Sequence, residues 1–154
     1  MKGVIMGQSK KSGAIILVAE DDSDDRLLLK RALEDNGFSG VLQFVNDGVE
    51  LMDYLRCSKC GKSAKAGPRP DIILLDLNMP RKDGREALRD IRADADLNGI
   101  TIVAMTGSEP QHDTEICHRL GADRLMTKPD GYSMWVQLMG KVLGLLNGSS
   151  LTAS

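Results

Sequence analysis

Residues 71–84 read Asp-Ile-Ile-Leu-Leu-Asp-Leu-Asn-Met-Pro-Arg-Lys-Asp-Gly, a hydrophobic run that stops at an acid and a turn. The four consecutive aliphatic residues, Ile72 to Leu75, are typical of a strand covered on both faces, as parallel strands in α/β domains are. The run ends on the carboxylate of Asp76. Because open α/β sheets bind ligands beyond the C-terminal ends of their strands, Asp76 is expected to lie where such a domain does its chemistry.

Strands and helices alternate along the rest of the chain. Four more short apolar segments have strand character, and they span residues 14–19, 41–45, 100–105 and 124–127. Helical apolar spacing follows each strand: a helix capped by Ser23 and stopped at Asn36-Gly37, helices over 49–55 and 86–93, one that starts at Ser108, and a last one over 134–146. Such alternation predicts an α/β fold, a flavodoxin-like doubly wound parallel sheet of five strands in the order 2-1-3-4-5 with five helices.

Composition and charge exclude several classes of function. The net charge is -2 and the isoelectric point is near 5.7, so nucleic-acid binding is not expected. No apolar run approaches the roughly 20 residues of a membrane span, and residues 1–13 lack a signal-peptide core, so we expect a cytoplasmic protein without membrane contact. We expect a flexible leader over 1–13, one domain over 14–147, and a polar tail over 148–154 that leaves no room for an output domain.

Residues 56–70 are almost devoid of apolar side chains and are predicted to form a long loop, well beyond the usual roughly 2 to 6 residues. A zinc interpretation would use the pair Cys57-x-x-Cys60, with Cys117, His112 and His118 as further ligands. Only one such pair exists, and the helix that carries the other candidates is expected to lie away from the loop. Zinc is therefore the less favoured interpretation, and the cysteines are expected to stay thiols in a reducing compartment.

Polar side chains follow the predicted strands at the edge where ligands bind. Since strand 1 lies beside strand 3 in this order, Glu20 and Asp21 should lie one inter-strand spacing, ~5 Å, from Asp76. Strand 4 brings Thr106 and strand 5 brings Lys128 to the same edge. Three neighbouring carboxylates repel one another, and a divalent cation with a preference for hard oxygen ligands, Mg²⁺ rather than zinc, would relieve that repulsion. With a lysine and a hydroxyl beside it, Asp76 is predicted to be a nucleophile that forms an acyl phosphate.

Over about residues 15–146 the chain resembles the receiver domains of two-component response regulators. The matching residues are Glu20-Asp21, Asp76-Leu-Asn-Met-Pro, Asp83-Gly84, Thr106-Gly107 and Lys128-Pro129. The resemblance implies that Asp76 accepts a phosphoryl group from the phosphohistidine of a sensor histidine kinase or a phosphotransfer protein. It also implies that Asp21, Asp76 and the backbone carbonyl of Asn78 hold Mg²⁺, with Glu20 assisting through water. Thr106 and Lys128 would bind the phosphoryl oxygens, and in the family the peptide bond before Pro129 is usually cis.

A narrower resemblance, to small regulators that partner bacterial and cyanobacterial phytochromes, rests on residues 76–86 and on the long segment before the third strand. It implies a phytochrome-type kinase as partner. Such regulators often dimerise through the face formed by the helix from Ser108, the strand 124–127 and the last helix. That helix carries two apolar stripes, one made of Met134, Leu138, Val142 and Leu145 and the other of Trp135, Met139, Leu143 and Leu146. Either the second stripe is a self-association surface or the helix is deeply seated, and the sequence leaves both open.

Two residues depart from the family pattern, and three other functions are disfavoured. Leu125 stands where the family often has a Tyr or Phe that swings inward, and Asp130 stands where a Phe is common.

The resemblance implies a signalling domain that acts by altered partner binding or dimerisation, and an enzyme only toward its own phosphoryl group. An aspartyl-phosphate phosphatase needs an acid where this chain has Asn78, and a flavin module needs a phosphate-binding loop where it has acids. A phosphorylation-independent adaptor is disfavoured by the intact set of acids, threonine and lysine. Asp22, Asp24 and Asp25 are interpreted as a solvated helix start, and Asp83 as a turn or cap residue.

Overall fold

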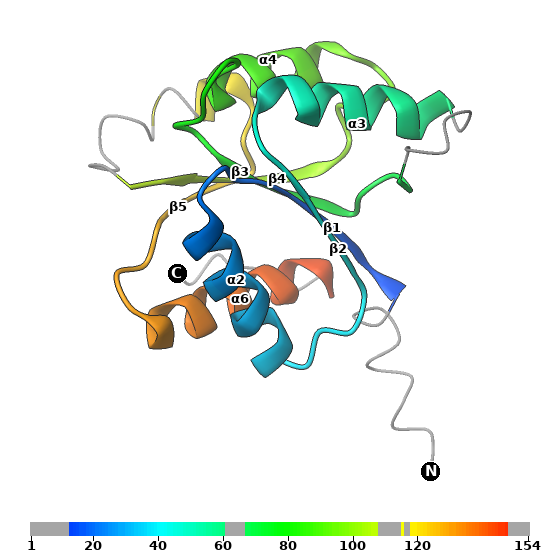
Figure 1. The fold of residues 1–154 in the computed structure, drawn as a ribbon. Coiled ribbons are helices and arrows are strands. Elements are labelled where there is room, and N and C mark those ends of the chain that lie inside the picture. The colour runs from blue at the N-terminus through cyan, green and yellow to red at the C-terminus, as the bar shows by residue number, and fades with distance from the viewer. Residues whose placement is uncertain (1–12, 61–66, 108–114, 116–117, 148–154) are drawn as a thin grey trace.

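A computed structural model describes residues 13–60, 67–107, 115 and 118–147, which form a three-layer α/β domain (Figure 1). The predicted leader, apart from Gly13, and the predicted tail lie outside these residues. None of the helices in the described ranges is long and apolar enough to cross a membrane.

The middle layer is a parallel sheet in the order β2-β1-β3-β4-β5, which confirms the predicted topology. Its strands are β1 (Ile15–Ala19), β2 (Val41–Val45), β3 (Ile72–Asp76), β4 (Thr101–Thr106) and β5 (Arg124–Thr127). Every residue of the central strand β3 is buried, as its unbroken aliphatic run predicts. In the register Ala19 pairs with Leu75, so the residues that follow them, Glu20 and Asp76, lie at the same level of the edge.

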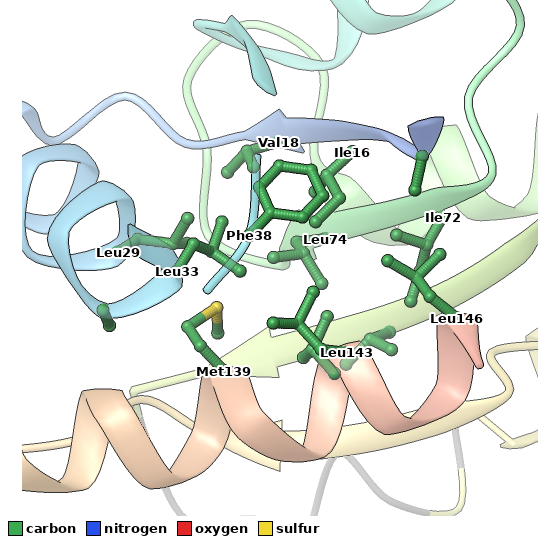
Figure 2. Close-up of a cluster of buried hydrophobic side chains, with 14 of the residues drawn as sticks. Ile16, Val18, Leu29, Leu33, Phe38, Ile72, Leu74, Met139, Leu143 and Leu146 are labelled. Atoms are coloured by element: carbon green, nitrogen blue, oxygen red, sulfur yellow. The ribbon is translucent and has the colours of Figure 1, made fainter. Parts of the chain in front are cut away.

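Helices cover both faces of the sheet (Figure 1). Helices α2 (Ser23–Asp35) and α6 (Tyr132–Leu146) pack together on one face, and α3 (Gly48–Cys60) and α4 (Gly84–Ala93) pack together on the other. Figure 2 shows the core of the first face, where Ile16, Val18, Ile72 and Leu74 of the sheet point toward Leu29 and Leu33 of α2 and Met139 and Leu143 of α6. Burying each such side chain stabilises the fold by roughly 1.5–3 kcal/mol.

The last helix keeps one of its two apolar stripes entirely in this core. Trp135, Met139, Leu143 and Leu146 are all buried, whereas Met134 on the other stripe is 55% exposed. Within the stripe that contains Met134, Val142 is buried, and Leu138 and Leu145 are half-buried. The helix is therefore firmly seated and still presents apolar surface at its N-terminal end.

Several element boundaries differ from the sequence predictions, among them the start of α6, which is Tyr132 and not residue 134. The N-cap of α2 is Asp22 and not Ser23, because the Asp22 carboxylate accepts hydrogen bonds from the backbone N–H groups of Asp24 (2.8 Å) and Asp25 (3.0 Å). Helix α3 continues to Cys60, five residues into the predicted 56–70 loop, since no glycine or proline interrupts the chain before Gly61. Helix α4 starts two residues early, at Gly84, and Asp83 caps it as predicted.

The helix predicted from Ser108 lies largely outside the described residues, where only Glu115 and residues 118–120 are assigned to a helix. Most of the residues of the zinc interpretation also lie outside the described side chains, and Cys57 is a free thiol.

Candidate functional site

Three carboxylates meet at the C-terminal ends of β1 and β3, as the strand order predicts. Glu20 and Asp21 directly follow β1, Asp76 is the last residue of β3, and one oxygen from each lies within 4.8 Å of the others. Glu20 is 1% and Asp76 3% exposed, while Asp21 faces solvent. Asn78 lies beside them, since its backbone N–H donates to Oδ1 of Asp76 at 3.0 Å.

Lys128 reaches this group from the end of β5. Its ammonium nitrogen lies 2.7 Å from Oε1 of Glu20, 2.9 Å from Oδ2 of Asp76 and 3.0 Å from Oδ2 of Asp25. The backbone N–H of Lys128 donates to the carbonyl oxygen of Thr106 at 2.8 Å, which extends the pairing of β4 and β5 and directs the lysine to the edge. The sequence predicts Lys128 at this edge of the sheet, whereas Asp25 was interpreted as part of a solvated helix start.

Thr106 is the last residue of β4 and is completely buried. Strand β4 lies between β3 and β5, and Met105 pairs with Asp76 while Thr106 pairs with Thr127. The threonine therefore lies between the acid and the lysine along the edge. All of the predicted side-chain site residues are brought to one edge of the sheet.

Burial and neighbouring charge shape the ionisation of the site. Burial raises the pKa of Glu20 to about 7, and the negative charge of Asp76 acts in the same direction, against the hydrogen bond from Lys128. Burial alone would lower the pKa of Lys128, but hydrogen bonds to Glu20, Asp76 and Asp25 outweigh it and raise that pKa above its usual range. Lys128 therefore stays protonated, and burial favours the uncharged form of Glu20 unless further positive charge is present.

The acidic cluster fits a divalent cation. A cation beside Glu20, Asp21 and Asp76 would supply the charge that the buried Glu20 lacks, and an all-oxygen donor set with one solvent-facing member suits a hard ion that keeps some of its water. The fit rests on the donor atoms and on the raised pKa of Glu20.

The segment after Asp76 is packed tightly against its surroundings. We call residues 77–83 the acceptor loop. At its far end the N–H of Gly84 donates to the carbonyl oxygen of Leu77 (3.2 Å), and a Cβ at residue 84 would lie 2.5 Å from the carbonyl oxygen of Asp76. At its middle, Arg81 pairs with the buried Asp47, which precedes α3. No local pattern in the sequence indicates this ion pair.

The structure corrects one implication of the resemblance and shows the surroundings of the two departing residues. Among the described residues no peptide bond is cis, so the bond before Pro129 is trans. Leu125 is half-buried and packs near Leu77 and Ala104, and Asp130 is exposed in the turn before α6.

A groove of about 440 Å³ runs between the edge strand β5 and α6. Its lining includes Leu125, Met126, Met134, Leu138 and Lys141. Met134 and Leu138, from the stripe of α6 that is only partly buried, thus border this groove.

Residues 16–136 match the family model of the response regulator receiver domain. The chain is similar to the response regulator Rcp1 of Synechocystis sp., with 33% identity over 123 residues, 80% of this chain and 82% of that protein. Among solved structures it is similar to the phosphorylated cyanobacterial phytochrome response regulator RcpA, with a TM-score of 0.77 and 34% identity over 87% of this chain and 94% of that one. It is also similar to the Mn²⁺-bound form of Rcp1, with a TM-score of 0.76 and 29% identity over 89% of this chain and 96% of that one.

Proposed function

Because the chain belongs to the response regulator receiver domain family of two-component signalling, we propose that Asp76 accepts a phosphoryl group from the phosphohistidine of a sensor histidine kinase or a phosphotransfer protein. The observation that carries the proposal is the position of Lys128, whose ammonium group lies 2.9 Å from a nearly buried Asp76 within a cluster of carboxylates. A carboxylate with a permanent cation at its side and a buried hydroxyl nearby is equipped for phosphoryl transfer.

In the proposed reaction a carboxylate oxygen of Asp76 attacks phosphorus, an O–P bond forms, and the P–N bond of phosphohistidine breaks with its electron pair left on the imidazole nitrogen. Lys128 moves from Asp76 to a phosphoryl oxygen while Glu20 and Asp25 retain it. Thr106 donates its hydroxyl hydrogen to another phosphoryl oxygen. Glu20, Asp21, Asp76 and the backbone carbonyl of Asn78 would hold Mg²⁺, which when bound neutralises charge on the phosphoryl oxygens.

The domain signals; it is not a conventional enzyme. Asn78 follows Asp76 by two residues and carries no acid that would activate a water molecule, which disfavours the phosphatase alternative. The adaptor alternative leaves unexplained why Lys128, Asp76 and Glu20 remain assembled at contact distance.

The test is labelling with a small phosphodonor. With acetyl phosphate and Mg²⁺ the protein should gain one phosphoryl group by intact mass spectrometry, and Asp76→Asn should abolish the gain. Asp53→Asn, which changes an exposed acid on α3, is the matched control and should label like the wild type. Labelling that persists in the Asp76 variant, or a wild type that never labels, would reject the proposal.

The proposed partner is a phytochrome-type histidine kinase, and the support is the similarity to a structure described as a cyanobacterial phytochrome response regulator. The same proposal places the chain in the cytoplasm, where histidine kinases have access to ATP. Phosphotransfer from each histidine kinase of the source organism, measured at short times, would identify the partner. Preferred transfer from a kinase without a phytochrome module would overturn the phytochrome assignment and leave the acceptor chemistry intact.

The proposed output is self-association through β5 and α6, together with the helix predicted from Ser108. The support is the groove beside β5 and the exposure of Met134. An exposed apolar side chain next to an unpaired edge strand is typical of a surface that binds another protein.

A further inference from the structure

Asp47 and Arg81 lie 34 residues apart and form a two-point contact beside the acceptor loop. Nε of Arg81 donates to Oδ2 of Asp47 at 2.7 Å, and Nη2 donates to Oδ1 at 3.2 Å. We infer that these two are positioning residues. They fix the acceptor loop so that the backbone carbonyl of Asn78 and the carboxylate of Asp76 hold a divalent cation, and so that Asp76 accepts the phosphoryl group. The inference rests on the proposed function.

The Asp47 end of the contact is rigid. Asp47 is 5% exposed, and its Oδ1 also accepts a hydrogen bond from the N–H of Glu50 at 2.9 Å, while its carbonyl oxygen accepts from Leu51 at 3.0 Å. The carboxylate thus caps the start of α3 and binds the guanidinium at the same time. The hydrogen bond from Arg81 holds the pKa of Asp47 below its usual range, which agrees with a carboxylate that stays ionised in this buried place.

The Arg81 end is a backbone conformation that needs support. Its φ is +61°, in the left-handed region that residues other than glycine seldom adopt. The side chain is 58% exposed, so burial does not fix it, and the two hydrogen bonds to Asp47 are what order it. A planar guanidinium that binds a carboxylate at two points sets orientation as well as distance.

A second contact ties the same two segments together. The N–H of Gly48 donates to the carbonyl oxygen of Lys82 at 3.1 Å, and a Cβ at residue 48 would lie 2.5 Å from that oxygen. The turn before α3 therefore touches the acceptor loop through the backbone at Lys82 and through a side chain at Arg81.

These contacts bear on the site because Asn78 lies between two fixed points. Upstream, the N–H of Leu77 donates to the carbonyl oxygen of Met105 at 3.0 Å, and that of Asn78 donates to Asp76. Downstream, Arg81 is held by Asp47. With both points fixed, the backbone at Asn78 keeps one orientation toward the acids. Without the Arg81 contact the loop would keep its backbone hydrogen bonds and the pair of Lys82 with Asp90, but the contact closest to Asn78 on the downstream side would be gone and its carbonyl would lose its fixed direction.

A purely electrostatic role and a positioning role of Arg81 predict opposite changes in cation affinity for the same substitution. Arg81→Ala removes a positive charge from the loop that follows Asp76, and on electrostatic grounds alone the acidic cluster should then bind a cation more tightly. If Arg81 positions the loop, the same change should bind a cation more weakly, because losing an outer-shell partner of a metal site typically costs tenfold or more in affinity.

The experiment measures Mn²⁺ binding to the folded full-length chain by the electron paramagnetic resonance signal of free Mn²⁺. The variants are Arg81→Ala, Arg81→Lys, and Lys82→Ala as the charge-matched control. Lys82→Ala removes the same charge one residue away, breaks the side-chain pair with Asp90, and keeps the carbonyl oxygen that Gly48 uses. Arg81→Lys retains the charge and one donor to Asp47, so this conservative variant is expected to fold even if Arg81→Ala does not. Circular dichroism confirms that each variant is folded at the temperature of the titration.

We expect Arg81→Ala to weaken Mn²⁺ binding about tenfold, Arg81→Lys to weaken it less, and Lys82→Ala to leave it unchanged or slightly tighter. Labelling by acetyl phosphate should slow in the same order. If the wild type binds Mn²⁺ and labels normally while both Arg81 variants bind it as well or better, the inference is wrong and the proposed function stands. A wild type that neither binds Mn²⁺ nor labels would overturn the proposed function and this inference with it.

Discussion

The ammonium nitrogen of Lys128 lies 2.9 Å from Oδ2 of Asp76, although the two residues are 52 positions apart and their strands are separated in the sheet by β4. Lys128→Ala would leave the buried carboxylates of Glu20 and Asp76 without their cation. We expect the free energy of unfolding in metal-free buffer at neutral pH to fall by about 3 kcal/mol, since removing one partner of a buried ion pair leaves uncompensated charge.

Urea denaturation with EDTA and with excess Mg²⁺ measures this effect. Mg²⁺ should stabilise the Lys128 variant more than the wild type, because the cation then replaces the missing ammonium group. The variant should also uncouple phosphorylation from conformational change. Dimerisation that still responds fully to phosphodonor would show that Lys128 has no such role.

Capping at the start of α2 gives a second prediction. Asp22→Ala removes the acceptor for two backbone N–H groups and should lower stability by about 1 kcal/mol. Ser23→Ala, one residue later inside the helix, is the control and should change stability by less than about 0.5 kcal/mol. Urea midpoints compare the two. A larger loss for Ser23→Ala would restore the assignment that the sequence alone suggests.

This pair of residues illustrates what the sequence can and cannot determine. The strand order and the residues at the strand ends were predictable, because the apolar runs that stop at Asp76 and Thr106 indicate buried strands directly, and the short segment 124–127 before Lys128 completes the strand–helix alternation. The identity of a cap among Glu20-Asp21-Asp22-Ser23 was not, since all four side chains accept hydrogen bonds and only the backbone angles select one.

Contacts between segments that are distant in the chain could not be predicted from the sequence either. Asp25 was interpreted from its own helix as a solvated acid, yet its Oδ2 lies 3.0 Å from the ammonium nitrogen of Lys128, which follows β5. Asp47 belongs to an Asn-Asp-Gly turn signal, and nothing local to it indicates a partner 34 residues away. The end of α3 was placed too early because polar residues without glycine or proline continue a helix as readily as they form a loop.

The acid response of Asp47 gives a third prediction. Its pKa in the folded protein is lowered from 3.8 by Arg81, so the pair contributes stability that is present above pH 3.8 and is lost as the pH falls through the folded pKa. Asp47→Asn lacks this contribution, which is small because the arginine is exposed to solvent. Urea denaturation above and below that pH should therefore show that the wild type has a larger free energy of unfolding than Asp47→Asn, and that this difference decreases only in acid. A gap that is independent of pH would contradict the assignment.

Self-association gives a fourth prediction. Met134 is 55% exposed beside the groove between β5 and α6, so Met134→Glu should weaken dimerisation while stability changes by less than about 0.5 kcal/mol. Leu143→Ala, on the buried stripe of the same helix, should instead lower stability by about 2–5 kcal/mol. Light scattering over a range of protein concentrations, with and without phosphodonor, reads out the first effect. A wild type that stays monomeric at every concentration would refute the dimer.

The close approach of Gly84 to the carbonyl oxygen of Asp76 limits which sequences this site tolerates. In a saturation library, every residue except glycine would bring a Cβ to within 2.5 Å of that oxygen, and the oxygen belongs to backbone fixed in the central strand. Substitution at residue 84 would therefore displace the acceptor itself. The next helical position that faces solvent, Glu86, carries no such restriction, so tolerance to mutation should change abruptly within two residues of the chain.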